Sequence, residues 1–171
     1  IKRAERDVVL NEYFYKLFKK FCPGPITFVL KKKQNSKIYP LATANLNTVA
    51  IRFPSHRIIR SILKISNFPL AMPSANISSK LSPVNAFDVF DEFKNRLKII
   101  INGGQAKFGI ESTVIDLTNK PKILRPGVID AKLISKVLNK KTNIEIKNLK
   151  IKSPGMLKKH YSPGIPVLIN Q

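Results

Sequence analysis

The sequence predicts an α/β (or α+β) fold in which a twisted mixed sheet is flanked by helices. Three observations support this prediction. Apolar runs of strand length recur along the chain, and polar loops follow them. Other segments repeat their apolar residues at the three- and four-residue spacing of one helix face. The two kinds of segment mix without strict alternation, which favours a mixed sheet. With 171 residues, the chain is long enough for one medium-sized domain.

The first half of the chain is predicted to hold two helices and two strands. Apolar residues recur on one face from 10 to 21, and Pro23 stops that helix because proline cannot continue it. The strands are expected at 26–30 and 48–53. Residues 56–65 have helical periodicity and form the second predicted helix.

The second half is less regular. A short strand at 69–72 is predicted to lead into a polar loop, and Ser82, which is followed by proline, is expected to cap a helix. That helix would bury Ala86, Val89, Phe90 and Phe93. A tight turn is expected at 102–104. The remaining strands are predicted at 97–101, 112–117 and 122–125. A last helix is predicted over 130–138, with Asp130 as its cap.

The chain is strongly basic, because 31 Lys and Arg residues against 10 Asp and Glu give a formal net charge of +21. Such a charge attracts polyanions, so RNA and nucleotide phosphates are natural partners. An A/T-rich genome would also favour the codons of lysine, isoleucine and asparagine, and this explanation carries equal weight. The basic residues are spread along the chain rather than gathered in one tail.

Composition disfavours several classes of function. The single cysteine, Cys22, excludes an internal disulfide and a multi-cysteine metal cluster, and it fits a reducing, cytoplasmic location. Cys22 lies beside a proline and is expected to pack in the core rather than react. No apolar run is long enough to span a bilayer, so no membrane partner is expected. His56 and His160 are the only histidines, and the sequence has no Walker loop or dinucleotide fingerprint.

Four polar loops carry the candidate chemistry, since open sheets present ligand-binding groups at strand ends. Arg52 ends one strand and can grip a carboxylate or phosphate with two parallel hydrogen bonds. A third loop runs through 103–113, and a fourth places Arg125 before a Pro-Gly pair. The second loop is crowded with small polar residues that can bind phosphate, namely Ser74, Asn76, Ser78, Ser79 and Ser82. Each loop alone is equally well explained as a surface arginine, a turn or a helix cap.

In this order, the loops resemble the YrdC-like family of threonylcarbamoyl-AMP synthases, over residues 21–163. The matching motifs are Pro23-Gly-Pro-Ile-Thr27, Val49-Ala-Ile-Arg-Phe-Pro-Ser-His56, Pro69-Leu-Ala-Met-Pro-Ser-Ala-Asn76, Ser82-Pro83, Gly109-Ile-Glu-Ser-Thr-Val114 and Leu124-Arg-Pro-Gly127. The stretch 153–163 resembles the linker of the two-domain branch. Each motif alone is weak, whereas the ordered set is specific. The resemblance implies a YrdC-like twisted mixed sheet.

The resemblance implies a nucleotidyltransferase that converts L-threonine, bicarbonate and ATP into threonylcarbamoyl-AMP and pyrophosphate. The product feeds the threonylcarbamoyl modification of adenosine in tRNA, so the tRNA-modification proteins that act downstream are implied partners. Mg²⁺ is expected to accompany ATP, and no protein ligand for it is assigned.

The resemblance also implies roles for the matched residues. Arg52 would hold the threonine carboxylate, while Ser112 and the backbone of Met72 would line the amino-acid pocket. The catalytic residues implied are Arg52, Ser74 and Asn76, with Asn76 orienting the reacting groups. The residues implied around ATP are Thr48, Ser74, Ser82, Arg125 and Tyr161.

Some features depart from the family pattern. The family carries an upstream Lys-x-Arg motif, which Lys2-Arg3 does not match, and an upstream threonine-binding strand is missing. Lys158-Lys159 stand where the linker usually has an arginine and an aromatic residue. We therefore expect residues 1–140 to be a catalytic domain without its front end. Residues 141–171 are expected to be an inter-domain linker, with the second domain absent.

Two alternatives stay open. The chain could be a catalytically defective fragment that acts as a basic module, with tRNA, double-stranded RNA or nucleotides as its partner. Its ten phenylalanines fall mostly at core-periodic positions, which favours the enzyme. A carbamoyl-transfer domain of the hydrogenase-maturation type is disfavoured, because that relative lies among zinc-finger cysteines and this chain has one cysteine.

Overall fold

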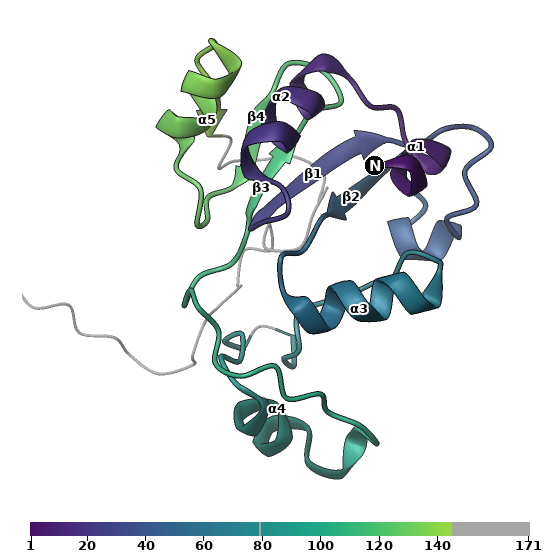
Figure 1. Ribbon diagram of the computed structural model, residues 1–171, viewed down its shortest axis with the longest axis vertical. Coiled ribbons are helices and arrows are strands. Elements are labelled where there is room, and N and C mark those ends of the chain that lie inside the picture. The colour runs from purple at the N-terminus through teal and green to yellow at the C-terminus, as the bar shows by residue number, and fades with distance from the viewer. Residues whose placement is uncertain (79, 145–171) are drawn as a thin grey trace, which may run out of the picture. The chain divides into compact units, whose positions relative to one another are not determined.

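The computed structural model describes residues 1–78 and 80–144 (Figure 1). The chain divides into two units. In the described residues, the first unit consists of 1–71 with 110–144, and the second lies within 72–109. The first unit contains the sheet and most of the buried core.

The sheet has five strands in the order β2-β1-β3-β4-β5. β1 pairs antiparallel with β2 and parallel with β3, and β4 pairs antiparallel with β3 and parallel with β5. The sheet is therefore mixed, which confirms the predicted fold class. The strand bounds are β1 (Ile26–Lys31), β2 (Thr48–Arg52), β3 (Thr113–Asp116), β4 (Lys122–Arg125) and β5 (Asn143–Ile144).

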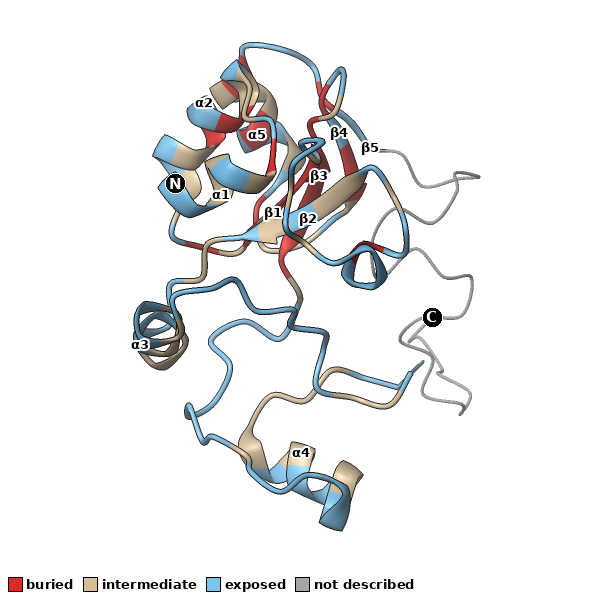
Figure 2. Cartoon of the chain, turned by 90° about the vertical axis from the view of Figure 1, so that its right-hand side faces the viewer, coloured by how far each residue is buried: buried red, intermediate tan, exposed pale blue. Residues whose placement is uncertain are grey.

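The first unit also contains five helices in the described residues. The bounds are α1 (Lys2–Asp7), α2 (Glu12–Phe21), the 3₁₀ helix η1 (Pro40–Thr43), α3 (Arg57–Ser66) and α5 (Ala131–Leu138). Buried residues lie between the sheet and the helices α1, α2 and α5 (Figure 2). None of the described helices is long and apolar enough to cross a membrane.

Alternation along β1 separates a core face from a second face. Ile26, Phe28 and Leu30 are fully buried and belong to the core that includes Phe14 of α2 and Ile134 of α5. The rings of Phe14 and Phe28 meet edge-on, with centroids 5.0 Å apart. Because successive side chains of a strand point to opposite faces, Thr27 lies on the face away from this core. That second face carries the candidate site.

Most elements of the first unit begin and end close to their predicted bounds. The helix predicted at 10–21 is α2, and its cap is Asn11, whose side chain accepts a hydrogen bond from the backbone N–H of Phe14 at 3.0 Å. Asp130 caps α5 as predicted, accepting from the N–H of Lys132 at 2.6 Å. The predicted strands 26–30, 48–53, 112–117 and 122–125 and the helix 56–65 are likewise confirmed.

Three short elements of the first unit were not predicted: α1, η1 and β5. Each has six residues or fewer, which is too short for a periodic pattern to show. Tertiary contacts hold them instead. The carboxylate of Asp7, at the end of α1, accepts hydrogen bonds from the Ser36 hydroxyl and the backbone N–H of Lys37, both at 2.9 Å. β5 pairs with β4 at the edge of the sheet.

The second unit corrects two strand predictions. Residues 69–72, at the boundary of the units, and 97–101 form no strand. Three side chains of the second run, Leu97, Ile99 and Ile101, are 41%, 80% and 59% exposed. An apolar run becomes a strand only where another strand satisfies its backbone groups, and no paired strand is found here in the described residues. Residues 102–104, where a tight turn was expected, have no assigned turn, although the Gly104 N–H donates to the Asn102 side chain at 2.9 Å and Gly104 has a positive φ of 82°.

The helix of the second unit is α4 (Ala86–Phe93), followed by the 3₁₀ helix η2 (Lys94–Arg96). The prediction that Ser82 caps it is wrong: α4 begins later, and the Asn85 side chain accepts from the backbone N–H of Asp88 at 2.9 Å. Burial is also less than predicted. Phe90 is 55% exposed, and none of the α4 residues is fully buried.

Candidate active site

The candidate site is built around Thr27 on β1. Thr27 pairs directly with Arg52 of the antiparallel neighbour β2 and with Val114 of the parallel neighbour β3. Paired residues on adjacent strands project their side chains from the same face of a sheet. Thr27 and Arg52 therefore share the face that lies away from α2 and α5.

An irregularity in β4 adds a second arginine to this face. The register between β3 and β4 shifts after Val114, which pairs with Arg125, and leaves Leu124 as an extra residue in β4. Such a bulge bends a strand and re-aims its side chains. Leu124 is buried in a small cluster with Val114, and the guanidinium of Arg125 turns to Ser112. Simple alternation would have placed Leu124 and Arg125 on opposite faces.

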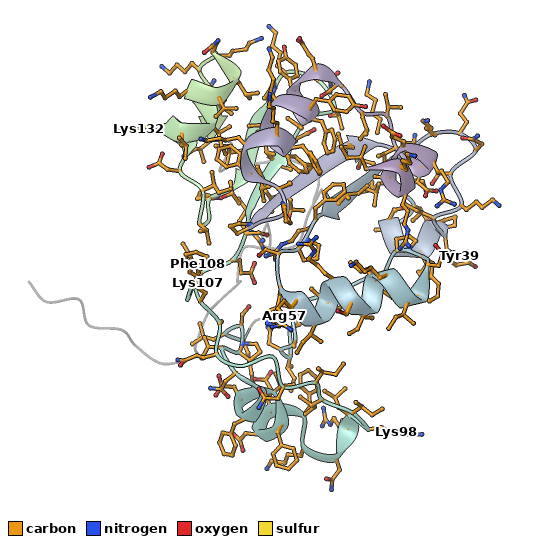
Figure 3. All side chains as sticks on the ribbon, in the orientation of Figure 1. Tyr39, Arg57, Lys98, Lys107, Phe108 and Lys132 are labelled. Atoms are coloured by element: carbon orange, nitrogen blue, oxygen red, sulfur yellow. The ribbon has the colours of Figure 1, made fainter. Side chains whose placement is uncertain are left out.

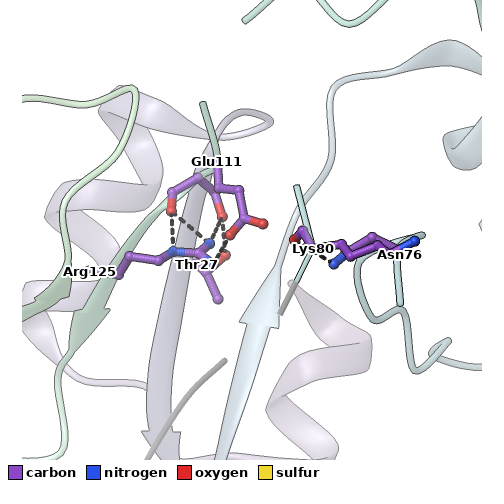
Figure 4. Close-up of polar contacts among 6 residues, drawn as sticks. Thr27, Asn76, Lys80, Glu111 and Arg125 are labelled. Atoms are coloured by element: carbon purple, nitrogen blue, oxygen red, sulfur yellow. Dashed lines mark hydrogen bonds and ion pairs between the residues drawn. The ribbon is translucent and has the colours of Figure 1, made fainter. Parts of the chain in front are cut away.

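Ser112, just before β3, is the residue on which these groups converge. Figure 4 shows three of its neighbours in this region, Thr27, Glu111 and Arg125, close to one another. Its hydroxyl lies 2.9 Å from the hydroxyl of Thr27 and accepts a hydrogen bond from Nη2 of Arg125 at 3.1 Å. Its carbonyl oxygen accepts from Nε and Nη2 of Arg125 at 3.2 and 2.9 Å. Nη1 of Arg125 forms an ion pair with the carboxylate of Glu111. Every guanidinium nitrogen of Arg125 thus contacts Ser112 or Glu111.

The charges of this face interact. Partial desolvation, and then the like charge of Arg125, lower the pKa of Arg52, whereas the carboxylate of Glu111 opposes this change. Arginine titrates so far above neutrality that Arg52 stays protonated at pH 7. Nε of Arg52 donates weakly to the carbonyl oxygen of Gly24, at 3.4 Å. The cluster of these two guanidiniums and one carboxylate has a net positive charge, which suits an anionic ligand.

In the second unit, the predicted polar loop is tied to α4. The backbone N–H of Ile77 donates to the Glu92 carboxylate, and that of Val84 donates to the Asp88 carboxylate at 2.9 Å. The amide of Asn76 donates to the carbonyl oxygens of Ile77 and Lys80 at 2.9 and 3.0 Å. Asn76 is thereby a residue that shapes the loop.

The structure gathers Arg52, Ser112 and Arg125 on one sheet face. Thr48 is four residues before Arg52 on β2 and so projects from the same face, about 13 Å away along the strand. Four further predicted site residues, Met72, Ser74, Asn76 and Ser82, lie in the second unit, where Met72 and Ser74 are exposed. Tyr161 lies outside the described residues.

Two residues of the site were not singled out from the sequence. Thr27 is a single hydroxyl in an otherwise apolar strand, and its position on the face opposite the core was the available signal. Glu111 lies in a loop and immediately precedes Ser112, and its position beside that residue was the available signal. Both gain their roles from segments far away in the sequence.

The expected Mg²⁺ finds no protein-built site among the described residues. No group of three or more His, Cys, Asp or Glu side chains gathers there, and the Glu111 carboxylate is engaged with Arg125. Mg²⁺ prefers several oxygen ligands in octahedral geometry. The described side chains therefore do not fit an ion held by the protein alone.

Burial keeps Cys22 out of this chemistry. The residue packs against the hydrophobic core, and desolvation raises the pKa of its thiol to about 11. Since the thiolate is the nucleophile, Cys22 is unreactive at neutral pH, in agreement with its predicted place in the core.

Fold and site together define a mixed-sheet α/β protein with a net positive cluster of polar side chains on one sheet face. Residues 1–127 match the Sua5, YciO and YrdC family model, described as "Telomere recombination". Residues 129–171 match a model described as "Threonylcarbamoyl-AMP synthase, C-terminal domain". The chain belongs to the Sua5/YrdC family.

Individual relatives agree with this assignment. The chain is 41% identical over 159 residues to threonylcarbamoyl-AMP synthase of Pyrococcus abyssi, covering 90% of this chain and 46% of the relative. It is 38% identical over 157 residues to threonylcarbamoyl-AMP synthase of Bacillus subtilis, covering 90% of this chain and 45% of the relative. The chain thus spans less than half of the length of these two relatives.

Solved structures show the same fold. The crystal structure of Pyrococcus abyssi Sua5 complexed with L-threonine matches 95% of this chain and 49% of its own, with a TM-score of 0.87 and 38% identity. The crystal structure of Escherichia coli YciO matches 78% of this chain and 65% of its own, with a TM-score of 0.62 and 25% identity.

Proposed function

We propose that this protein is a nucleotidyltransferase that forms L-threonylcarbamoyladenylate and pyrophosphate from L-threonine, bicarbonate and ATP, for tRNA threonylcarbamoyladenosine modification. One observation carries the proposal: a Sua5/YrdC family member presents Arg52 beside Thr27 and Ser112 on the sheet face that lies away from α2 and α5. The similar Pyrococcus abyssi Sua5 was crystallised with L-threonine, which supports an amino acid as the ligand.

In this proposal Arg52 holds the threonine carboxylate. Its guanidinium is charged and exposed and lies on the same face as the Ser112 hydroxyl, so it can make two parallel hydrogen bonds to a carboxylate. Ser112 then contacts the amino acid, together with the backbone of Met72. Fixing the amino acid in this way orders the reacting groups before chemistry begins.

The chemical step needs no protein nucleophile. The threonine amine and bicarbonate form a carbamate with loss of water. A carbamate oxygen then attacks the α-phosphorus of ATP, the new O–P bond forms, and the bond to the β-phosphate breaks to release pyrophosphate. The charge that develops on the phosphate oxygens is stabilised by fixed cationic groups and hydrogen-bond donors.

ATP would contact Thr48 and Arg125 on the sheet face, and Ser74, Ser82 and Tyr161 elsewhere in the chain. Asn76 would orient the loop that carries Ser74, a role that agrees with its hydrogen bonds to Ile77 and Lys80. We also propose that residues 1–140 form the catalytic domain and 141–171 the inter-domain linker.

The test is threonine-dependent ATP–pyrophosphate exchange in the presence of bicarbonate. We expect exchange in the protein and a loss of about 100-fold or more in Arg52→Ala, because a charge-assisted bidentate contact disappears. Arg60→Ala, an exposed arginine of α3, is the matched control and should keep full activity. Undiminished exchange in Arg52→Ala would remove Arg52 from the site, and no exchange in the unaltered protein would reject the function.

A second candidate function is binding of RNA, because neighbouring helices present lysines to solvent. α2 and α5 pack together, and their exposed lysines are Lys16, Lys19, Lys20, Lys132 and Lys136. Figure 3 shows Lys132 projecting from α5 away from the sheet. If RNA binds through these charges, the binding constant should fall steeply as the salt concentration rises. Each Lys→Ala substitution that removes a phosphate contact should reduce the slope of log K against log[salt] by roughly 0.9. A salt slope unchanged in these variants would reject this surface.

A further inference from the structure

The orientation of the Ser112 hydroxyl is set by its neighbours. Ser112 is only 6% exposed, and both of its oxygen atoms are hydrogen-bonded. The hydroxyl meets Thr27 at 2.9 Å and Nη2 of Arg125 at 3.1 Å, and the same Nη2 also reaches the carbonyl oxygen at 2.9 Å. A buried serine bonded on several sides has few hydroxyl orientations to choose from.

The numbers of donors and acceptors further limit the orientation of the Ser112 hydroxyl. A serine hydroxyl has one hydrogen to donate and two lone pairs that accept. A guanidinium only donates, so Arg125 occupies one lone pair of Ser112. Thr27 and Ser112 share one hydrogen bond in which either hydroxyl can donate. When Thr27 donates, both lone pairs of the Ser112 hydroxyl are occupied, and the Ser112 hydrogen remains for a bond to a ligand.

Glu111 governs whether Arg125 can hold this position. The two side chains form an ion pair and are 23% and 14% exposed respectively, so water screens the pair only in part. The backbone beside Glu111 is fixed separately, since its carbonyl oxygen accepts from the N–H of Val128 at 3.2 Å. Loss of the Glu111 charge would leave two like-charged guanidiniums, Arg125 and Arg52, to repel each other.

We propose that Thr27, and Glu111 acting through Arg125, are positioning residues that fix Ser112 as a hydrogen-bond donor to the amino-acid substrate. The inference rests on the proposed function, because it takes threonine as the ligand. It gives Arg125 a role besides contact with ATP: its guanidinium braces the serine that contacts the amino acid.

The first test removes the Thr27 hydroxyl with little change of shape. In Thr27→Val, we expect the KM for L-threonine in the exchange reaction to rise about tenfold, the loss that one hydrogen bond of this kind produces. The KM for ATP should change by less than about twofold. Thr27→Ser should restore the threonine KM, whereas Thr118→Val, which removes a hydroxyl bonded to Asp116, is the matched control. An unchanged threonine KM in Thr27→Val overturns the role of Thr27.

The second test removes the charge of Glu111. Glu111→Gln should also raise the threonine KM by about tenfold, and Glu12→Gln, an exposed glutamate of α2, is its control. Because both residues act on Ser112, the double variant Thr27→Val/Glu111→Gln should lose less than the product of the single effects. Losses that multiply in the double variant would mean that the two residues act independently, and the proposal would be wrong.

A third measurement does not depend on activity. The Nε–H of Arg125 donates to the Ser112 carbonyl, so in NMR spectra it should exchange slowly with water, and Glu111→Gln should accelerate that exchange about tenfold or more. If the unaltered protein lacks threonine-dependent ATP–pyrophosphate exchange, the proposed function fails, but the NMR measurement still tests whether Glu111 and Arg125 position Ser112. A fast-exchanging Arg125 Nε–H in the unaltered protein, or no acceleration in Glu111→Gln, would contradict the proposal that Glu111 and Arg125 position Ser112.

Discussion

Gly127, just after β4, packs directly on the peptide backbone of Ser112. A Cβ atom added at Gly127 would lie 2.6 Å from the Ser112 carbonyl carbon and 2.5 Å from the Thr113 nitrogen. The neighbours cannot yield easily, because the Thr113 hydroxyl donates to the carbonyl oxygen of Ile129 at 2.8 Å and accepts from the Ile129 N–H at 2.9 Å. The glycine therefore determines how close the Arg125–Gly127 segment comes to the candidate site.

Gly127→Ala should both destabilise the protein and displace Ser112. Forcing an extra methyl group against fixed backbone costs about 1–3 kcal/mol, and the displaced serine should reduce threonine-dependent exchange by more than about tenfold. Thermal unfolding and exchange rates measure the two effects. Gly109→Ala is the control for stability, because a Cβ at Gly109 meets nothing within 4 Å. Equal melting temperatures for Gly127→Ala and the unaltered protein would contradict the packing.

Asn11 ties α2 to the end of β3, and Asn11→Ala should destabilise the protein. The side-chain oxygen caps α2 at the N–H of Phe14, and the side-chain amide donates to the carbonyl oxygen of Leu117 at 2.7 Å. Loss of a cap and of a second hydrogen bond costs about 1–3 kcal/mol together. Denaturant unfolding should rank the unaltered protein above Asn11→Ser, which can still cap, and Asn11→Ser above Asn11→Ala. Equal stabilities for Asn11→Ser and the unaltered protein would show that the bond to Leu117 contributes nothing, and equal stabilities for the two variants would show the same of the cap.

How far the sequence predicts this structure differs between the two units. The first unit follows its local pattern, because the apolar spacing of α2 and the alternation of β1 match the core that they build. The runs at 69–72 and 97–101 have the same apolar character, yet they form no strand. Strand formation depends on a pairing partner distant in sequence, which a local pattern does not reveal.

The candidate site shows the same limit. Sequence motifs predict Arg52 and Ser112 as site residues. Their proximity in space depends on Thr27, whose hydrogen-bond partner Ser112 is 85 residues away in the sequence. The bulge that turns Arg125 to Ser112 is a matter of register between β3 and β4. Register depends on how the strands pair, so residue types alone do not give it.

Cys22 should react slowly with iodoacetamide at pH 8. With a pKa of about 11 in the folded protein, against about 8.5 in an unfolded chain, the thiolate at pH 8 is roughly 200-fold scarcer in the folded protein, and alkylation should be slower by a similar factor. The same protein in urea is the control. A titration midpoint near pH 8.5 for the folded protein would show that the thiol is not desolvated.

The raised pKa of Cys22 also makes the free energy of unfolding depend on pH. A folded state that binds the thiol proton more tightly than the unfolded chain loses stability as the pH rises. The contribution of Cys22 is therefore fully present below about pH 8.5 and is lost progressively towards pH 11. Cys22→Ala should flatten this part of the stability curve. An identical alkaline slope in the variant would assign the loss to other groups.

In the second unit, α4 holds the polar loop through its acidic residues. Three of the ten Asp and Glu residues in the chain lie in this helix: Asp88, Asp91 and Glu92. Asp88 and Glu92 are one helical turn apart, so they share a face, and both accept hydrogen bonds from loop backbone, at Val84 and Ile77 respectively. A carboxylate that accepts a backbone N–H makes a strong bond, and its loss should free the loop.

We therefore predict that Glu92→Ala accelerates hydrogen exchange of the Ile77 amide by about tenfold. Asp91→Ala is the matched control, because Asp91 is an exposed acid on the same helix, and the Ile77 amide should exchange there as in the unaltered protein. The loop also carries Ser74, so Glu92→Ala should raise the KM for ATP more than the KM for threonine if Ser74 contacts ATP as proposed. If the Ile77 amide exchanges equally slowly in Glu92→Ala, the loop keeps its shape without the Glu92 carboxylate, and no effect on the KM for ATP is then expected.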